Sequence, residues 1–295
     1  MKTVLVTGAE GFIGRRLVQA LKQVGHETLE LTKADGDIAD PATLRCFDGV
    51  GIDFIFHLAG RTFVPDAWRD PADFQRVNVS GTVNVLELCR ARKLPLTYVS
   101  AYLYGIPESL PVRESDKIEP NNPYALSKFL AEAECRFYAE YLNLSVTIIR
   151  PFNIYGPGQK GHFLIPEIIS QVKAGKSIHL KDLTPRRDYL YLDDLVDALI
   201  RTLEPDPGCK MYNIGCGSSL SVAEIVGVIQ SVAGTTLPVT SENAQRNNEI
   251  PDVYADISKA AKALNWRPKY SFAQGIKDMF LNPKNQPEGA TYEQG

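Results

Sequence analysis

The first half of the chain alternates short apolar runs with longer amphipathic segments. Five short segments have the length of strands, and they lie at residues 4–6, 27–31, 54–60, 96–100 and 146–150; all but the second are largely apolar. Between them, three segments repeat apolar residues at helical spacing, at 17–24, 74–93 and 123–142. The first strand run lacks polar alternation, which is typical of a strand buried on both faces. Strands that alternate with helices predict an α/β fold with a doubly wound parallel sheet.

The pattern loosens beyond residue 151, where glycine and proline interrupt shorter elements. The clearest of these elements are a helix at 164–174, a strand at 211–215 and a helix at 222–233. We therefore predict a first domain over residues 1–152, with returns of the chain near 186–215, and a smaller C-terminal domain over 153–282. The polar tail at 283–295 is expected to be disordered.

Three glycines follow the first strand at intervals of three residues, at Gly8, Gly11 and Gly14. A strand that turns on glycines into a helix presents free backbone N–H groups, and the helix dipole favours an anion there. In such a turn the first glycine permits the sharp bend, the second a close approach to a pyrophosphate, and the third tight helix packing. The pattern predicts a Rossmann-type dinucleotide site. Its spacing differs from the common G-x-G-x-x-G, and a plain strand–helix connection is the alternative.

The end of the second strand bears on which dinucleotide binds. Folds of this kind often place a carboxylate there, which binds the adenosine ribose hydroxyls. Here the place holds Thr32 and Lys33, while Arg15 and Arg16 follow the glycine turn. Cationic side chains suit a 2′-phosphate, so the sequence favours NADP(H) slightly over NAD(H). The alternative is that Lys33 is a solvated loop lysine.

Three side chains carry candidate chemistry. Ser100 ends the fourth strand, at the sheet edge where ligands of open α/β sheets bind. Tyr124 and Lys128 are four residues apart on one predicted helix, hence on one face. An ammonium near a phenol lowers its pKa toward neutrality, which suits a tyrosine that transfers a proton while a nicotinamide transfers hydride. His57 lies within an apolar run, and we expect a core histidine rather than a catalytic one.

Composition narrows the class of partner. A net charge of −3 provides no basic surface for nucleic acid or an anionic membrane. No apolar run approaches the roughly 20 residues of a membrane span. The 5 cysteines contain no C-x-x-C pair, which favours reduced thiols, a cytoplasmic location and no metal site.

Taken together, these motifs resemble the extended short-chain dehydrogenase/reductase family, in its branch of nucleotide-sugar epimerases, dehydratases and reductases. The resemblance extends to about Phe280. The matching segments are Thr7-Gly8-x-x-Gly11-Phe12-x-Gly14, Gly36-Asp37-Ile38, His57-Leu58-Ala59-Gly60, Asn78-Val79-x-Gly81-Thr82, Ser100 before Tyr104-Gly105, Tyr124-x-x-x-Lys128, Arg150-Pro151-Phe152-Asn153-x-Tyr155-Gly156, Arg187-Asp188-Tyr189 and Asp193-Asp194.

The resemblance implies roles for these positions. The catalytic residues are expected to be Ser100, Tyr124 and Lys128. Tyr124 and Lys128 also belong to the cofactor set, whose other members are Gly8, Gly11, Phe12, Ile13, Gly14, Thr32, Lys33, Asp37, Ile38, Leu58, Ala59, Gly60 and Asn78. A nucleoside-diphosphate sugar is the implied substrate, and the residues expected to contact it are Arg61, Ser100, Tyr102, Asn153, Arg187 and Arg246.

Some of these roles are more specific. Asp37 and Ile38 are expected to flank the adenine, whereas Arg187 and Arg246 are expected to hold the diphosphate. Arg246 is the weaker match, because Asn247-Asn248 replaces the usual Pro-Gly and a solvated loop arginine is the alternative. The predicted helices at 74–93 and 123–142 resemble the pair that forms an intersubunit four-helix bundle in the family, which implies a homodimer.

One departure from the family pattern narrows the reaction. Dehydratases of this branch carry Asp-Glu directly after the serine or threonine position, and decarboxylating members use the same glutamate; here the places hold Ala101 and Tyr102. With dehydration and decarboxylation disfavoured, the remaining reaction is oxidation or reduction at C4 of the sugar. A 4-keto-6-deoxy nucleotide-sugar reductase is favoured by Lys33 and by the short link to Gly36, and a UDP-glucose 4-epimerase-like enzyme with tightly bound NAD is the alternative. A non-catalytic dinucleotide-sensing protein is a remote third reading, because such relatives lose the tyrosine or the lysine.

Overall fold

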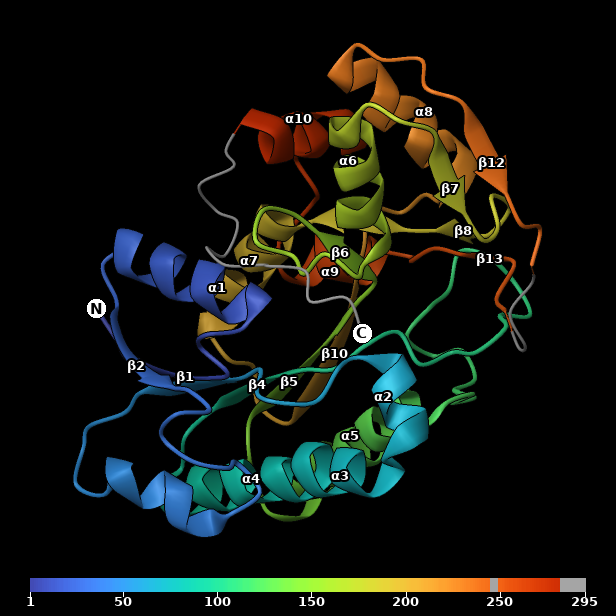
Figure 1. Ribbon diagram of the computed structural model, residues 1–295. Coiled ribbons are helices and arrows are strands. Elements are labelled where there is room, and N and C mark those ends of the chain that lie inside the picture. Colours follow the sequence, from blue (N-terminus) through green and yellow to red (C-terminus); the bar gives the residue numbers. More distant parts are fainter. Residues whose placement is uncertain (245–248, 282–295) are drawn as a thin grey trace.

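A six-stranded sheet forms the centre of the computed structural model, which describes residues 1–244 and 249–281 (Figure 1). Its strands in spatial order are β10 (Cys209–Ile214), β5 (Val146–Pro151), β4 (Leu96–Val99), β3 (Phe54–His57), β1 (Thr3–Thr7) and β2 (Glu27–Leu31). Every neighbouring pair is parallel. The chain runs outward from β1 to β2, then resumes at β3 in the opposite direction. This confirms the doubly wound α/β sheet, and it places the topological switch point between β1 and β3, where ligands of such sheets bind.

Helices cover both faces of the sheet (Figure 1). One face carries α1 (Phe12–Gln23), α7 (Leu192–Ile200), the turn η3 (Arg201–Leu203) and α9 (Ser258–Ala263). The opposite face carries the 3-10 helix η1 (Pro41–Phe47), α4 (Gly81–Arg92) and α5 (Pro123–Tyr141). Val4 and Val6 pack into the first of these layers and Leu5 into the second. The first strand is therefore buried on both faces, as its uninterrupted apolar run predicts.

The remaining elements gather beyond the carboxyl ends of the strands. They are α6 (Leu164–Ala174), α8 (Val222–Ala233), α10 (Phe272–Leu281) and three small sheets, formed by β6 (Asn153–Tyr155) with β9 (Tyr189–Tyr191), β7 (Ile178–Leu180) with β12 (Val239–Ser241), and β11 (Leu220–Ser221) with β8 (Arg186–Arg187) and β13 (Asp252–Val253). The helices α6, α8 and α10 share a separate apolar core around Ile168, Ile225 and Ile276. Along the chain, α7 and β10 come between α6 and α8 and return to the central sheet. They lie within residues 186–215, where the sequence predicts such a return. The division into two domains stays a prediction, and the tail at 283–295 lies outside the described residues.

The long helix expected at 74–93 differs from the prediction. It is preceded by α2 (Val64–Arg69), begins as α3 (Pro71–Gln75), widens into the π-helical turn η2 (Arg76–Ser80) and continues as α4. A π turn inserts one residue and re-aims side chains, and here it buries Asn78. Gly81 follows, where an added Cβ would lie 2.8 Å from Cγ2 of Ile38. The glycine therefore allows this helix to pass close to the loop that leaves β2.

Candidate active site

The glycine turn lies against the end of β3, with no room for side chains between them. Gly8 has φ +69°, and an added Cβ there would lie 2.8 Å from the backbone nitrogen of Ala59. At Gly14 an added Cβ would lie 2.2 Å from the carbonyl oxygen of Gly8. Gly11 is the N-cap of α1, and no side chain caps this helix. The exposed N–H groups of the first helical turn fit a pyrophosphate, so the residues present fit a dinucleotide.

The end of β2 carries a carboxylate that the sequence reading missed. Asp35 accepts hydrogen bonds from the backbone N–H of Thr32 (2.8 Å) and from its hydroxyl (2.7 Å). The backbone N–H of Lys33 donates to Glu10 (3.1 Å), while the Lys33 side chain is exposed. Arg16 is not part of this group, because its guanidinium binds both carboxylate oxygens of Asp193 on α7 (2.6 and 2.9 Å). Lys33 therefore lies near two carboxylates, those of Asp35 and Glu10, at the place where the adenosine ribose is expected.

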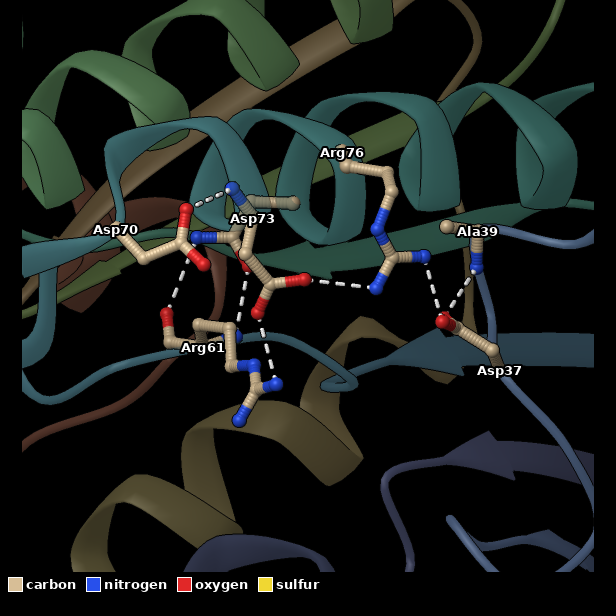
Figure 2. A network of polar contacts seen from close by, with 7 residues as sticks. Asp37, Ala39, Arg61, Asp70, Asp73 and Arg76 are labelled. Carbon is tan, nitrogen blue, oxygen red and sulfur yellow. Dashed lines mark hydrogen bonds and ion pairs between the residues drawn. The ribbon is translucent and has the colours of Figure 1, made fainter.

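A chain of ion pairs begins at Asp37, the residue expected beside the adenine (Figure 2). Its carboxylate accepts from the backbone N–H of Ala39 (3.0 Å) and from Nη1 of Arg76 (2.5 Å), and these contacts hold its pKa below the usual value. Arg76 also donates to Asp73 (2.7 Å), whose second oxygen lies 2.7 Å from Nη2 of Arg61. Sequence reasoning singled out Asp37 and Arg61 but missed the two residues that join them.

Asn78 extends this chain to the helix that carries the tyrosine and the lysine. Its side-chain oxygen accepts from the backbone N–H of Arg61 (2.7 Å), and its amide donates to the Arg61 carbonyl (3.1 Å). The same amide donates to Ser127 Oγ (2.8 Å), which in turn donates to the carbonyl of Tyr124 (2.8 Å). The buried asparagine therefore fastens the loop after β3 to the first turn of α5.

The first turn of α5 presents Tyr124 and Lys128 as the sequence predicts. Asn122 is the N-cap, since its side chain accepts from the backbone N–H of Ala125 (2.9 Å), and Pro123 is the first helical residue. Lys128 is 4% exposed, and its Nζ donates to the carbonyl of Val99 (2.8 Å), one residue before Ser100. Ser100 is also buried, and its hydroxyl has no hydrogen-bond partner among the described residues. A buried hydroxyl without a partner is what a substrate-binding serine needs to offer.

The electrostatics of the tyrosine differ from the expectation. Burial, together with the nearby Tyr102, raises the pKa of Tyr124, whereas the sequence reading expected Lys128 to lower it. The Lys128 ammonium donates to the carbonyl of Val99 and is not among the groups that shift the pKa of Tyr124. Burial also lowers the pKa of Lys128 to about 8. In this structure the phenol is therefore protonated at neutral pH and can act as an acid.

His57 has the core role expected of it. The ring is fully buried and contacts the hydroxyl oxygens of Thr7 (2.7 Å) and Thr82 (3.1 Å). Burial, with the charge of Lys128, lowers its pKa to about 3, so the ring is neutral. It joins β1, β3 and α4 and takes no proton at physiological pH.

Of the residues expected to contact the substrate, Tyr102 and Asn153 lie together, whereas Arg187 is bound to other side chains and backbone groups of the protein. Tyr102 stacks on Phe152 with ring centroids 5.2 Å apart, and its hydroxyl donates to Asn153 (3.4 Å). Arg187 is committed elsewhere: it donates to the carbonyl of Ile250 (2.5 Å) and forms an ion pair with Glu249. The sequence reading missed Glu249, which stands far from Arg187 along the chain. Arg246 lies outside the described residues.

In the described part of the chain, we find no candidate metal site, no candidate membrane-spanning helix and no disulfide. Within residues 1–244 and 249–281, no cluster of histidine, cysteine and acidic side chains could hold a metal ion. None of the helices described is both long and apolar enough to cross a membrane. All five cysteines are free thiols, and the cytoplasmic location stays a prediction.

Comparison with known proteins places this architecture in a family. Residues 4–215 match the model of the NAD dependent epimerase/dehydratase family. GDP-6-deoxy-D-mannose reductase of Pseudomonas aeruginosa is 30% identical over 288 residues, which cover 93% of this chain and 94% of the relative. UDP-glucose 4-epimerase of Mycolicibacterium smegmatis is also 30% identical, over 92% of this chain and 95% of the relative.

Solved structures agree with these relatives. The structure of RMD from Pseudomonas aeruginosa complexed with NADPH superposes with a TM-score of 0.88 at 29% identity, covering 96% of this chain and 99% of that chain. UDP-glucose 4-epimerase from Brucella ovis in complex with NAD gives a TM-score of 0.86 at 28% identity, covering 94% of this chain and 96% of that chain. The chain is therefore a member of the NAD dependent epimerase/dehydratase family, an enzyme family, and it shares its fold with these solved structures along nearly its whole length.

Proposed function

We propose that the protein is an NADPH-dependent reductase of 4-keto-6-deoxy nucleotide sugars. The observation that carries this proposal is the geometry of the site: the buried hydroxyl of Ser100, which has no partner among the described residues, follows Val99, whose carbonyl binds Lys128, and Tyr124 lies on the same helix as Lys128. A hydroxyl and a phenol in this arrangement can bind a ketone oxygen and donate a proton to it. The positions after Ser100 hold Ala101 and Tyr102, so no carboxylate follows the serine to abstract a proton for dehydration. The similarity to GDP-6-deoxy-D-mannose reductase supports the same chemistry.

The chain's own residues supply the proton and the positioning. A bound nicotinamide dinucleotide would supply hydride to C4 of the sugar. Tyr124 donates its phenolic proton to the C4 oxygen, which becomes a hydroxyl. Ser100 donates a hydrogen bond to the same oxygen as negative charge develops on it, and the buried ammonium of Lys128 would hold the nicotinamide ribose. The glycine turn and Asp37 would hold the pyrophosphate and the adenine.

The preference for NADPH rests on the exposed Lys33 at the end of β2. A 2′-phosphate would gain its ammonium as a partner, and it would also meet the nearby carboxylates of Asp35 and Glu10. Electrostatic attraction and repulsion are therefore both present, and a modest preference follows. Titration with NADPH and NADH tests it, and Lys33→Gln should remove any advantage of NADPH.

An epimerase acting at C4 of a UDP-sugar is the second candidate, supported by the similarity to UDP-glucose 4-epimerases. Such an enzyme would retain NAD through a full cycle of oxidation and reduction. Denaturing the purified protein and measuring the absorbance and mass of the released nucleotide separates the two. Tightly retained NAD would favour the epimerase, whereas an empty protein that binds NADPH reversibly would favour the reductase.

We further propose a homodimer that forms through α5. Four large apolar side chains, Leu126, Leu130, Phe137 and Tyr141, are exposed along one side of this helix. Their spacing of four, seven and four residues places them on a single stripe. Phe137→Glu places a charge in the stripe and should convert a two-chain sedimentation mass to that of one chain. A wild-type protein that sediments as one chain at micromolar concentration would contradict the dimer.

A further inference from the structure

An aromatic ring lies directly beneath the ammonium of the catalytic lysine. Tyr98 belongs to β4, is 1% exposed and points from the sheet toward α5. Nζ of Lys128 lies over this ring, 4.7 Å from its centroid. At this separation the negative face of the ring attracts a cation, and the attraction is strongest where water is excluded. Both side chains are buried, so the contact is of the strong kind.

The ring completes the surroundings of the ammonium. An ammonium has three N–H donors, and one of those of Lys128 goes to the carbonyl of Val99 (2.8 Å). Among the described residues Lys128 forms no ion pair. A Cβ added at Gly60 would lie 3.7 Å from Nζ and 2.8 Å from Oδ1 of Asn78, so the ammonium adjoins the loop after β3. The ring and the carbonyl hold the ammonium on one side and leave a donor for this loop, where the cofactor is expected.

We propose that Tyr98 is a positioning residue for the reaction: its ring face keeps the ammonium of Lys128 charged and aimed at the dinucleotide site. This inference rests on the proposed function for the role of the lysine, but not for the contact itself. The role is assigned to the ring rather than to the hydroxyl, because the ammonium lies over the face of the ring.

The other titratable groups around the ammonium do not replace the ring. His57 on β3 lies 5.6 Å from the Tyr98 ring and is neutral. Glu132 and Cys135 lie on later turns of α5, and both favour the charged lysine, but Glu132 is paired with Arg150. Tyr124 is protonated and neutral. Burial therefore remains the dominant influence on Lys128 and lowers its pKa to about 8. The ring face opposes this effect of burial, because it attracts only the charged form of the lysine.

The sign of the effect follows from this balance. Removing the ring removes an attraction that favours only the charged form, so the pKa of Lys128 must fall further. A desolvated cation–π contact predicts a fall of about one pH unit. Tyr98→Leu removes the ring and should show this fall. Tyr98→Phe keeps the ring face, removes only the hydroxyl, and is the matched control.

The test is an NMR titration of the protein labelled with ¹³C at the lysine ε carbon, without cofactor or substrate. The resonance of Lys128 is assigned from its absence in Lys128→Arg. We expect its apparent pKa to be about one unit lower in Tyr98→Leu than in wild type, and unchanged in Tyr98→Phe. Equal values in wild type and Tyr98→Leu, or an equal fall in both variants, would overturn the proposal.

A second series keeps the test decisive where the leucine variant does not fold. Position 98 is replaced by phenylalanines carrying zero, one and three ring fluorines, which weaken the negative ring face in steps while preserving its shape. The pKa of Lys128 should fall with each step, and the alkaline limb of kcat/KM should move to lower pH in parallel. A pKa of Lys128 that stays the same in all the fluorinated variants would refute the role of the ring. Absence of turnover with nucleotide sugars, with the lysine titration as expected, would count against the proposed function alone.

Discussion

The buried pair of Arg150 and Glu132 joins β5 to α5, and its removal is predicted to destabilise the fold strongly. The guanidinium donates from Nε to one carboxylate oxygen (2.9 Å) and from Nη2 to the other (2.6 Å), and both side chains are 0% exposed. The third nitrogen donates to the hydroxyl of Tyr104 (2.8 Å). Glu132→Gln preserves the shape of the side chain but leaves an uncompensated charge in a site that water does not reach. Breaking one partner of such a pair costs about 3–5 kcal/mol.

The assay is equilibrium unfolding in urea, with the slope m compared between variants. Glu30→Gln serves as the control. Glu30 pairs with Lys22, and both side chains are exposed (40% and 56%), so the pair contributes at most about 1 kcal/mol to the free energy of unfolding. The double variant Arg150→Met/Glu132→Leu removes both charges and should lose less stability than Glu132→Gln alone. A loss below about 1 kcal/mol in Glu132→Gln at unchanged m would refute the reasoning, since it would mean that the arginine is not truly desolvated.

Three further predictions follow from the cofactor site and the core. Arg76→Gln should raise the Kd for NADPH about three- to tenfold, because Asp37 loses a partner, while leaving the Kd for reduced nicotinamide mononucleotide, which lacks adenine, unchanged. Arg69→Gln, an exposed arginine of α2, should change neither Kd in the same fluorescence titration. Gly14→Ala should abolish dinucleotide binding or folding, seen by titration and circular dichroism, because its Cβ would lie 2.2 Å from a carbonyl oxygen. His57 has a pKa of about 3 when folded and about 6.5 when unfolded, so urea stability should fall as pH drops from 6.5 toward 3, with a shallower slope in His57→Gln.

The sheet could be predicted from the sequence because short apolar runs such as residues 4–6 and 54–56 alternate with amphipathic helical segments, a pattern typical of a parallel sheet between two helical layers. The start of α5 could also be predicted, because asparagine is a favoured N-cap and proline a favoured first helical residue, and Asn122 and Pro123 precede an amphipathic segment. The π turn around Asn78 could not be predicted, because it adds a single residue within an otherwise continuous helical pattern. Gly81 directly after this turn passes close to Ile38, a tertiary contact that the helical pattern does not encode.

The roles of the site residues stay a prediction, whereas the structure differs from the sequence-based expectation in the electrostatics of the site. The spacing of Tyr124 and Lys128 fixes their common helix face, but it does not fix where a long lysine side chain points. In the fold the ammonium turns to Val99 and Tyr98, and burial raises the pKa of the tyrosine. The carboxylate of Asp35 was missed for a similar reason, since it reaches back to the strand end from a turn three residues later.

The most direct test of the central claim is the transfer of deuterium from NADPH labelled at the nicotinamide C4 to a 4-keto-6-deoxy nucleotide sugar. We expect oxidation of one NADPH for each sugar reduced and deuterium at C4 of the product. We also expect the rate of sugar reduction to be roughly 10²- to 10⁴-fold lower in Tyr124→Phe. No consumption of NADPH, together with interconversion of UDP-glucose and UDP-galactose by protein that retains NAD, would contradict the central claim.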